Sequence, residues 1–265
     1  MLMTKFFCSK SSQIMSILAL TIISLIFSCS TRDDIILTIA VASNAQFALK
    51  EIAYEFTKET GIKTQIIVGS SGKHTAQIEA GAPFDIFISA DLKFPKTLYN
   101  QGLTVEEPEF YAYGTLVLWS FKDNIDLDLK ALLVSDIDHI AMPNPKTAPY
   151  GFAAYEVLTF FGIYDSIKPK LIYGESVTQT NQFIISKAVD IGFTSASSPM
   201  APKMKNKGRW QEIDNKAYSP IGQAAVVLKQ SQNLADANKF YLFLFSAKAR
   251  RILLSYRYKF YELQE

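Results

Sequence analysis

Short apolar runs rich in β-branched residues alternate with helically spaced segments along this chain, and no other feature constrains its fold as strongly. The first run, residues 35–42 (IILTIAVA), predicts a buried strand. Ser43 and Asn44 follow it as helix N-cap residues, and apolar residues then recur at helical spacing from Phe47 until Gly61. Because strand–helix–strand units repeat in this way, we predict an α/β fold with a mostly parallel sheet and helices on both faces.

The alternation continues over the rest of the chain. The segment 236–256 predicts a C-terminal helix that is broken near Ser246 and whose aromatic residues anchor it in the core. Further strands are predicted at 62–68, 85–89, 116–119, 139–142, 171–173, 191–194 and 224–228, and further helices at 73–80 and 152–161.

The N-terminal segment has the pattern of an export signal. Lys5 and Lys10 precede an apolar run at 14–27 that is short for a membrane span, and Ser28 then precedes Cys29. Residues 25–29 (LIFSC) resemble a bacterial lipobox, a signal that is cut just before its cysteine, which then carries lipid. We therefore predict a lipoprotein signal peptide over 1–28 and a mature chain in the periplasm or at the cell surface, anchored by Cys29. An ordinary signal peptide with an incidental cysteine is the alternative.

Charge and cysteine content narrow the functional class. The 27 basic residues include Lys5 and Lys10, so the mature chain carries equal numbers of basic and acidic residues and has no basic block. Nucleic-acid binding is therefore not expected. The two cysteines are Cys8 and Cys29, and cleavage before Cys29 leaves no possible internal disulfide, so the hydrophobic core alone must hold the fold.

Two loops share a design suited to anions. In 42–44 (ASN) and 69–72 (GSSG), hydroxyl or amide side chains stand between a predicted strand and a predicted helix. The first N–H groups of a helix have no intrahelical partner, and the helix dipole adds positive potential there. Such loops meet beyond the carboxyl ends of the strands, so together they predict an anion cleft of neutral donors. Plain helix capping is the alternative, and Lys73 is expected to remain in water.

Other chemistries match the sequence less well. A phosphate loop would need glycine at Ile67 and serine or threonine at His74. No G-x-S-x-G motif occurs, although His74 lies close enough to Ser71 in sequence to keep a secreted serine hydrolase as an alternative. No cluster of histidine, cysteine and carboxylate residues predicts a metal site. We therefore expect a binding protein without enzymatic activity or cofactor.

Several motifs carry a resemblance to a known family. They are IAVASNAQFAL (39–49), GSSGKHTAQIEAGAPFDIFISAD (69–91), APYGFAAYEVL (148–158), GESV (174–177), DIGFTSAS (190–197) and YRYKF (256–260). With these motifs the chain resembles the periplasmic molybdate-binding proteins of ABC transporters, the ModA family, over nearly its whole mature length.

The resemblance implies a type II periplasmic binding protein with two hinged α/β lobes. Residues 34–113 and 219–265 would form lobe 1, and residues 114–218 would form lobe 2. It implies capture of molybdate or tungstate, delivery to the permease of an ABC transporter, and a monomeric protein. A protein for sulfate or phosphate is the alternative within the class.

The resemblance also implies which residues hold the anion. The metal is bound as its oxyanion, with no direct metal ligands. Ser43 and Asn44 match the first anion-binding loop, and Ser71 matches the hydroxyl donor of the second loop. Tyr150 matches a position whose backbone N–H, and in some members its tyrosine hydroxyl, donates to the anion. Val177 matches a position that donates only its backbone N–H. Ser195 departs from the pattern, because some members have a ligand-binding tyrosine there, and members without it often have one at the position of Tyr150.

Overall fold

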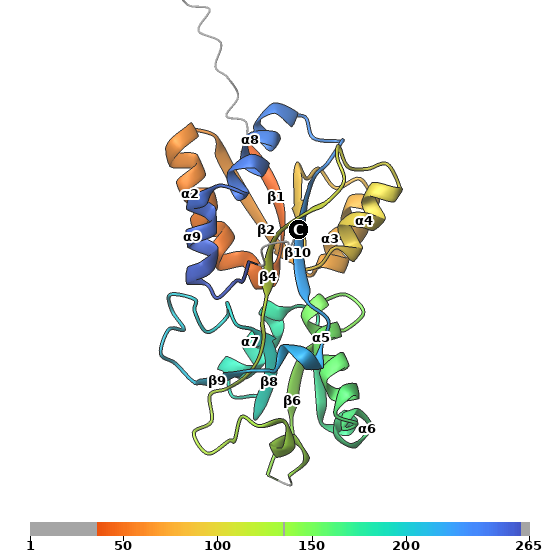
Figure 1. The fold of residues 1–265 in the computed structure, drawn as a ribbon, viewed down its shortest axis with the longest axis vertical. Helices are drawn as coiled ribbons and strands as arrows, with labels where there is room; N and C mark the ends of the chain where they lie inside the picture. Colours follow the sequence, from red (N-terminus) through yellow and green to blue (C-terminus); the bar gives the residue numbers. More distant parts are fainter. Residues whose placement is uncertain (1–35, 135, 261–265) are drawn as a thin grey trace, which may run out of the picture. The chain divides into compact units, whose positions relative to one another are not determined.

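The computed structural model describes residues 36–134 and 136–260 of the chain. The predicted signal peptide, residues 1–28, and the predicted lipid-bearing Cys29 lie outside the described residues. Two five-stranded sheets organise the described part, each flanked by helices (Figure 1). The α/β class predicted from the sequence is therefore confirmed.

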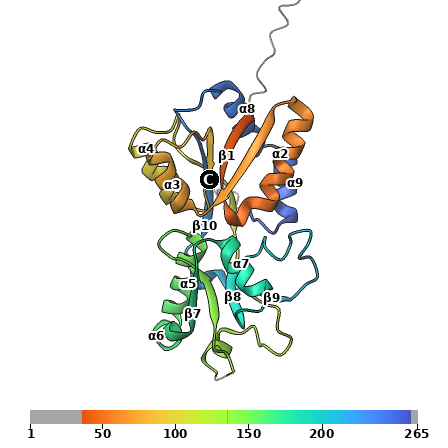
Figure 2. The same ribbon diagram turned by 180° about the vertical axis from the view of Figure 1, so that it is seen from behind.

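The first sheet has the strand order β2-β1-β3-β10-β4. β1 pairs in parallel with β2 and β3, whereas β10 pairs antiparallel with β3 and β4. Helices α2 and α9 lie on one side of this sheet, and α3 and α4 lie on the other, as the two opposite views agree (Figures 1 and 2). The elements are β1 (Ile36–Ala42), β2 (Lys63–Gly69), β3 (Ile86–Ile88), β4 (Glu109–Gly114), β10 (Ile221–Val227), η1 (Ser43–Ala45), α2 (Gln46–Thr60), α3 (Ser71–Glu79), α4 (Lys93–Asn100), α8 (Leu234–Leu244) and α9 (Ala247–Ser255).

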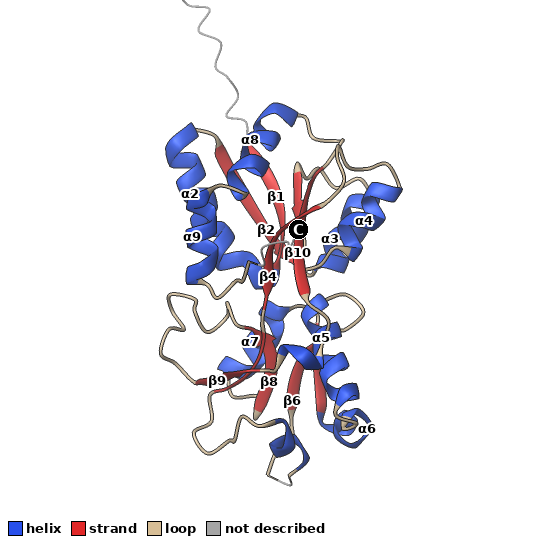
Figure 3. Cartoon of the chain, in the orientation of Figure 1, coloured by secondary structure: helices blue, strands red, loops and turns tan. Residues whose placement is uncertain are grey.

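The second sheet has the strand order β7-β6-β8-β5-β9. β6 pairs in parallel with β7 and β8, and β5 pairs antiparallel with β8 and β9. Helices α5, α6 and α7 accompany this sheet (Figure 3). The elements are β5 (Leu116–Ser120), β6 (Ile140–Pro143), β7 (Leu171–Gly174), β8 (Ile191–Ser195), β9 (Arg209–Glu212), η2 (Leu129–Leu133), α5 (Pro149–Phe160), α6 (Tyr164–Ile167), η3 (Lys168–Lys170), α7 (Val177–Ile185) and η4 (Asn215–Ala217).

Each sheet is mixed, which corrects the expectation of a mostly parallel sheet. The predicted parallel strands are present, but the chain passes between the sheets from β4 to β5 and again from β9 to β10. These connecting strands join their sheets antiparallel to their neighbours. The lobe boundaries proposed from the resemblance remain a prediction, since the strand pairing does not define them to the residue.

Apolar periodicity explains where the elements pack. The apolar side chains of β1 and the inner face of α2, including Leu37, Ile39, Leu49, Ile52 and Phe56, are buried in one cluster with α8 and α9. Burial of such a side chain stabilises the fold by about 1.5–3 kcal/mol. The packing fixes the end of β1, and therefore the loop that follows it.

The C-terminal segment forms two helices, as the sequence predicts. α8 ends at Leu244, and Ser246 caps α9, with its hydroxyl accepting a hydrogen bond from the Ala249 N–H at 3.2 Å. Ser246 is therefore a helix start, which explains the predicted break. Within the described ranges, no helix has both the length and the apolar character needed to cross a bilayer.

Candidate functional site

All five predicted ligand residues line one small cavity. Ser43, Asn44, Ser71, Tyr150 and Val177 share it, and their side chains are between 1% and 4% exposed. The space between atoms there is about 170 Å³. Part of that space is open to solvent, and the room left for a guest is small, so the cavity suits a small ion and not a sugar or an amino acid.

Helix N-termini surround the cavity. η1 begins at Ser43 and runs into α2, α3 begins at Ser71, α5 begins at Pro149 and α7 begins at Val177. Each start leaves backbone N–H groups without intrahelical acceptors and carries the positive end of a helix dipole. The cavity therefore collects hydrogen-bond donors from both sheets.

The cavity lining contains no charged side chain. Its residues are Ala42, Ser43, Asn44, Ser70, Ser71, Ala90, Ala148, Pro149, Tyr150 and Val177. Among the described residues, no group of three or more histidine, cysteine or carboxylate side chains is placed to hold a metal ion. A dry cavity of neutral donors can satisfy an anion that has several acceptor oxygens, because fixed dipoles replace its hydration shell.

Ser71 has a free donor in this cavity. Its Oγ accepts a hydrogen bond from the Ala90 N–H at 3.0 Å, so its own hydroxyl hydrogen remains available to another acceptor. The neighbouring Gly72 N–H is already used, since it donates to the Thr147 carbonyl oxygen at 2.9 Å. The GSSG loop thus places Ser71 in the cavity lining, and its role as a donor to an anion stays a prediction.

Asn44 is held by residues that sequence analysis did not identify. Its Nδ2 donates to Gln223 Oε1 at 2.8 Å and to the Tyr258 hydroxyl at 2.9 Å. Both side-chain amide hydrogens are therefore engaged, and Asn44 has its backbone N–H to offer an anion. The YRYKF motif contains Tyr258 but gives no sign of this contact, and nothing in the sequence around Gln223 indicates it.

Tyr150 enters the cavity from the first turn of α5. Its hydroxyl accepts a hydrogen bond from Gln223 Nε2 at 3.4 Å. A Cβ atom at Gly114 would lie 2.0 Å from this hydroxyl, so the glycine at the passage between the sheets makes room for the phenol. Burial raises the pKa values of Tyr111, Tyr150 and Tyr258 above the ordinary range, so all three phenols stay neutral donors.

Val177 presents a backbone N–H at the start of a helix that the sequence analysis missed. Ser176 caps α7, and its hydroxyl accepts from the Gln179 N–H at 3.4 Å. Gln179 Oε1 in turn accepts from the Glu175 N–H at 2.7 Å. The pattern S-x-x-Q is a capping box and is the signal that could have placed this helix.

Ser195 stands apart from the cavity lining. It is fully buried, and its hydroxyl pairs with those of Ser197 at 2.9 Å and Ser198 at 2.8 Å. Ser197 Oγ donates to the Asn44 carbonyl at 2.7 Å. Where some molybdate-binding proteins have a tyrosine, this chain therefore has a hydroxyl cluster that supports the first anion loop from behind.

His74, the residue that kept a serine hydrolase as an alternative, is buried. Its Nε2 lies 3.2 Å from the Val41 carbonyl oxygen and its Nδ1 lies 3.1 Å from Gln77 Oε1. Both ring nitrogens are thus directed at other groups and not at Ser71, so the alternative of a serine hydrolase lacks its general base. Burial lowers the pKa of His74, which keeps the imidazole neutral.

The Lys73 side chain stays exposed and does not line the cavity, as expected. Its Nζ lies 3.2 Å from Glu175 Oε1, and both side chains are more than half exposed. This ion pair joins α3 to the loop before α7. A second contact joins α2 to α7, where Gln46 Nε2 donates to Thr178 Oγ1 at 2.9 Å. None of these four residues lines the cavity, so the contacts add no charge to it.

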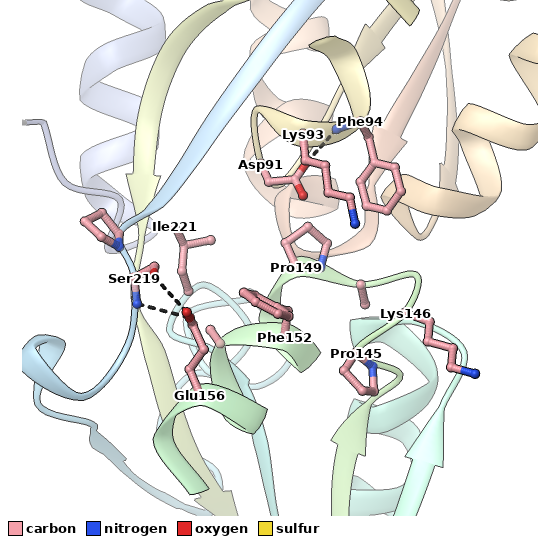
Figure 4. Close-up of a pocket in the computed structure, with 13 residues that line it drawn as sticks. Asp91, Lys93, Phe94, Pro145, Lys146, Pro149, Phe152, Glu156, Ser219 and Ile221 are labelled. Carbon is pink, nitrogen blue, oxygen red and sulfur yellow. Dashed lines mark hydrogen bonds between the residues drawn. The ribbon is translucent and has the colours of Figure 1, made fainter. Parts of the chain in front are cut away.

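A larger cavity lies beside the first and has a different character. The space between atoms there is about 690 Å³, part of it open to solvent, and the lining is mostly apolar but includes the carboxylates of Asp91 and Glu156 (Figure 4). The Ser219 N–H and hydroxyl both donate to Glu156, at 3.1 and 2.7 Å, which ties the returning strand to α5. Lys93 and Lys146 also line this cavity, so its charges are mixed and its surface is mostly apolar. It lacks the set of helix starts that surrounds the small neutral cavity, which is therefore the candidate site.

The fold and this site define a class of protein. The chain belongs to the bacterial extracellular solute-binding proteins, whose family model matches residues 37–259. Within that class it is similar to two proteins named molybdate-binding protein ModA. It is 38% identical to the protein of Rhodobacter capsulatus, over 83% of this chain and 86% of the relative. It is 36% identical to the protein of Azotobacter vinelandii, over 83% of this chain and 88% of that relative.

Comparison with solved structures also finds a molybdate-binding protein. The periplasmic molybdate-binding protein of Azotobacter vinelandii matches this structure with a TM-score of 0.82 and 35% sequence identity, over 85% of this chain and all of that one. The predicted resemblance and the predicted two-lobed fold are thereby confirmed.

Proposed function

We propose that this chain captures molybdate or tungstate outside the cytoplasmic membrane and delivers it to the permease of an ABC transporter. The observation that supports the proposal most strongly is the small cavity of neutral donors, to which both sheets contribute. The chain's relatives named for molybdate binding support the same ligand. In this proposal the protein acts as a monomer, has no catalytic residue and no cofactor, and contacts the oxyanion only through its oxygens.

The chemistry of the cavity separates the candidate anions. Molybdate near neutral pH is a dianion with four acceptor oxygens and no proton, so donors alone can satisfy it. Phosphate usually keeps one proton, which would meet few acceptors here, and an unpaired buried donor costs about 1–3 kcal/mol. Sulfate has no proton, but its shorter bonds leave the same donors farther from its oxygens.

Calorimetric titration of the mature chain with four anions tests the proposed function. We expect molybdate and tungstate to bind, and phosphate to bind at least about tenfold more weakly than molybdate. Sulfate should also be weaker, because only size excludes it. Equal affinity for sulfate and molybdate would contradict the proposal and favour the alternative of a sulfate-type protein. Turnover of model esters would instead favour a hydrolase.

We also propose that Cys29 anchors the protein to a membrane through lipid. A single acyl chain binds membranes only weakly, so stable anchoring requires more than one chain on the new N-terminus. Cys29→Ala should release the mature chain or leave the signal peptide attached, as membrane fractionation and the mass of the product would show. Normal processing together with unchanged partitioning would rule out the anchor and leave the function in the cavity untouched.

A further inference from the structure

Gln223 is a fully buried polar residue on the strand that returns to the first sheet. The pairing of β10 with β4 shifts register between Gln223 and Ala224, which marks a β-bulge. A bulge re-aims the side chain of its strand and is common beside functional sites. Here the extra residue is Tyr111 of β4, next to Gln223, whose amide is buried where an unpaired polar group would be costly.

The Gln223 amide joins the two parts of the anion cavity. Its Oε1 accepts from Asn44 Nδ2 at 2.8 Å and from the Tyr111 hydroxyl at 3.2 Å. Its Nε2 donates to the Tyr150 hydroxyl at 3.4 Å. Asn44 belongs to the loop after β1 and Tyr150 to the first turn of α5, so this one side chain contacts cavity residues from both lobes.

The directions of these hydrogen bonds follow from the donor inventory. A carboxamide oxygen has two lone pairs, and Asn44 and Tyr111 occupy both on Gln223. The amide orientation is therefore fixed, and its N–H must face Tyr150. Because the Tyr150 hydroxyl accepts this hydrogen bond, its own hydrogen must be donated elsewhere.

We propose that Gln223 is a positioning residue that makes Tyr150 a donor to the bound oxyanion and holds Asn44 in place. The inference rests on the proposed function and concerns the same cavity. Gln223 does not line that cavity, so it acts through Asn44 and Tyr150 and not by touching the ligand.

Gln223→Glu reverses the hydrogen bonding at constant size. The introduced carboxylate accepts but does not donate, so the Tyr150 hydroxyl turns its hydrogen toward the carboxylate and away from the anion. We expect molybdate affinity to fall at least about tenfold at about pH 8. Burial raises the pKa of such a carboxyl group, so at about pH 5.5 its protonated form donates again and part of the affinity returns.

The recovery at low pH separates positioning from general damage. Calorimetric titrations with molybdate at both pH values should show it in Gln223→Glu and not in the wild type. Gln223→Met removes both roles without adding charge and should weaken binding about equally at the two pH values. Tyr111→Phe removes one hydrogen bond of the same amide but leaves Asn44 and Tyr150 in contact with it, so its affinity should stay within about threefold of the wild type.

The outcomes distinguish this inference from the proposed function. Tight wild-type binding with unchanged affinity in Gln223→Glu and Gln223→Met would overturn the positioning role alone. If Gln223→Glu loses the same affinity at both pH values, the positioning role is also overturned. General disturbance of the buried site by the substitution would then explain the loss. Wild-type protein that binds none of the four tetrahedral anions would overturn both proposals.

Discussion

Replacement of Ser71 by alanine is expected to weaken molybdate binding about ten- to a hundredfold. Its hydroxyl accepts from the Ala90 N–H and so has one hydrogen left to donate to an anion in the closed cavity. A hydrogen bond to a charged group contributes about 1.5–3 kcal/mol, which corresponds to that loss. Calorimetric titration of the variant measures it directly.

Stability must be measured alongside affinity in this experiment. Ser71→Ala also leaves the buried Ala90 N–H without its acceptor, which lowers the free energy of unfolding by about 1–3 kcal/mol. Thr75→Val is the matched control, since the Thr75 hydroxyl is buried in the same helix, donates to the Ser71 carbonyl at 2.9 Å and does not line the cavity. That variant should lose stability while molybdate affinity changes less than about threefold.

Lys73 tests whether charge or neutral donors hold the anion. Its side chain is half exposed and pairs with Glu175, and exposed ion pairs contribute only about 0–1 kcal/mol. Lys73→Ala should change affinity a few fold, mainly through the association rate, and salt should reduce the difference. A larger effect than that of Ser71→Ala, persisting at physiological salt, would contradict the neutral-donor mechanism.

Replacement of Gly151 by alanine is expected to reduce molybdate affinity more than about a hundredfold. A Cβ atom there would lie 2.1 Å from the Pro143 carbonyl oxygen and 2.8 Å from the Asn144 carbonyl carbon. These are backbone atoms at the end of β6, so the first turn of α5 must move away from the sheet. That movement carries the Tyr150 N–H and hydroxyl out of position, and binding constellations tolerate only about 0.5 Å.

Gly192→Ala is the control for this prediction. Its added methyl group would meet the Ile184 side chain at 2.7 Å in the core of the same sheet, away from the cavity. Overpacking costs about 1–3 kcal/mol, so thermal unfolding should detect both variants. Molybdate titration should separate them, because only Gly151→Ala displaces a donor. Near-normal affinity in Gly151→Ala would show that the α5 N-terminus does not bind the anion.

The two anion loops were predictable because their signals are local. A buried apolar strand, a short hydroxyl- or amide-bearing turn and a helical repeat follow each other within about ten residues at both Ser43 and Ser71. The S-x-x-Q capping box before α7 is equally local, and attention to it would have placed the helix that begins at Val177.

The supporting residues were not predictable in the same way. Gln223 reaches Asn44 across 179 positions of sequence and Tyr258 reaches it across 214. The pairing of β10 in the first sheet and the bridge between Tyr113 and Lys259 bring them together. The mixed pairing of each sheet also depends on where the chain returns from the other lobe. The contacts of His74 were equally out of reach, since its partner Val41 lies 33 positions away in the sequence.

The neutral lining of the cavity also determines the electrical properties of the loaded protein. No side chain of the cavity can release or take up a proton to compensate a dianion, and the buried tyrosines remain neutral. Binding of a dianion such as molybdate would therefore leave the protein two charges more negative than the empty form at the same pH. Since the mature sequence balances its acidic and basic residues, that difference is large relative to its net charge. Empty and loaded molecules would therefore migrate differently in an electric field.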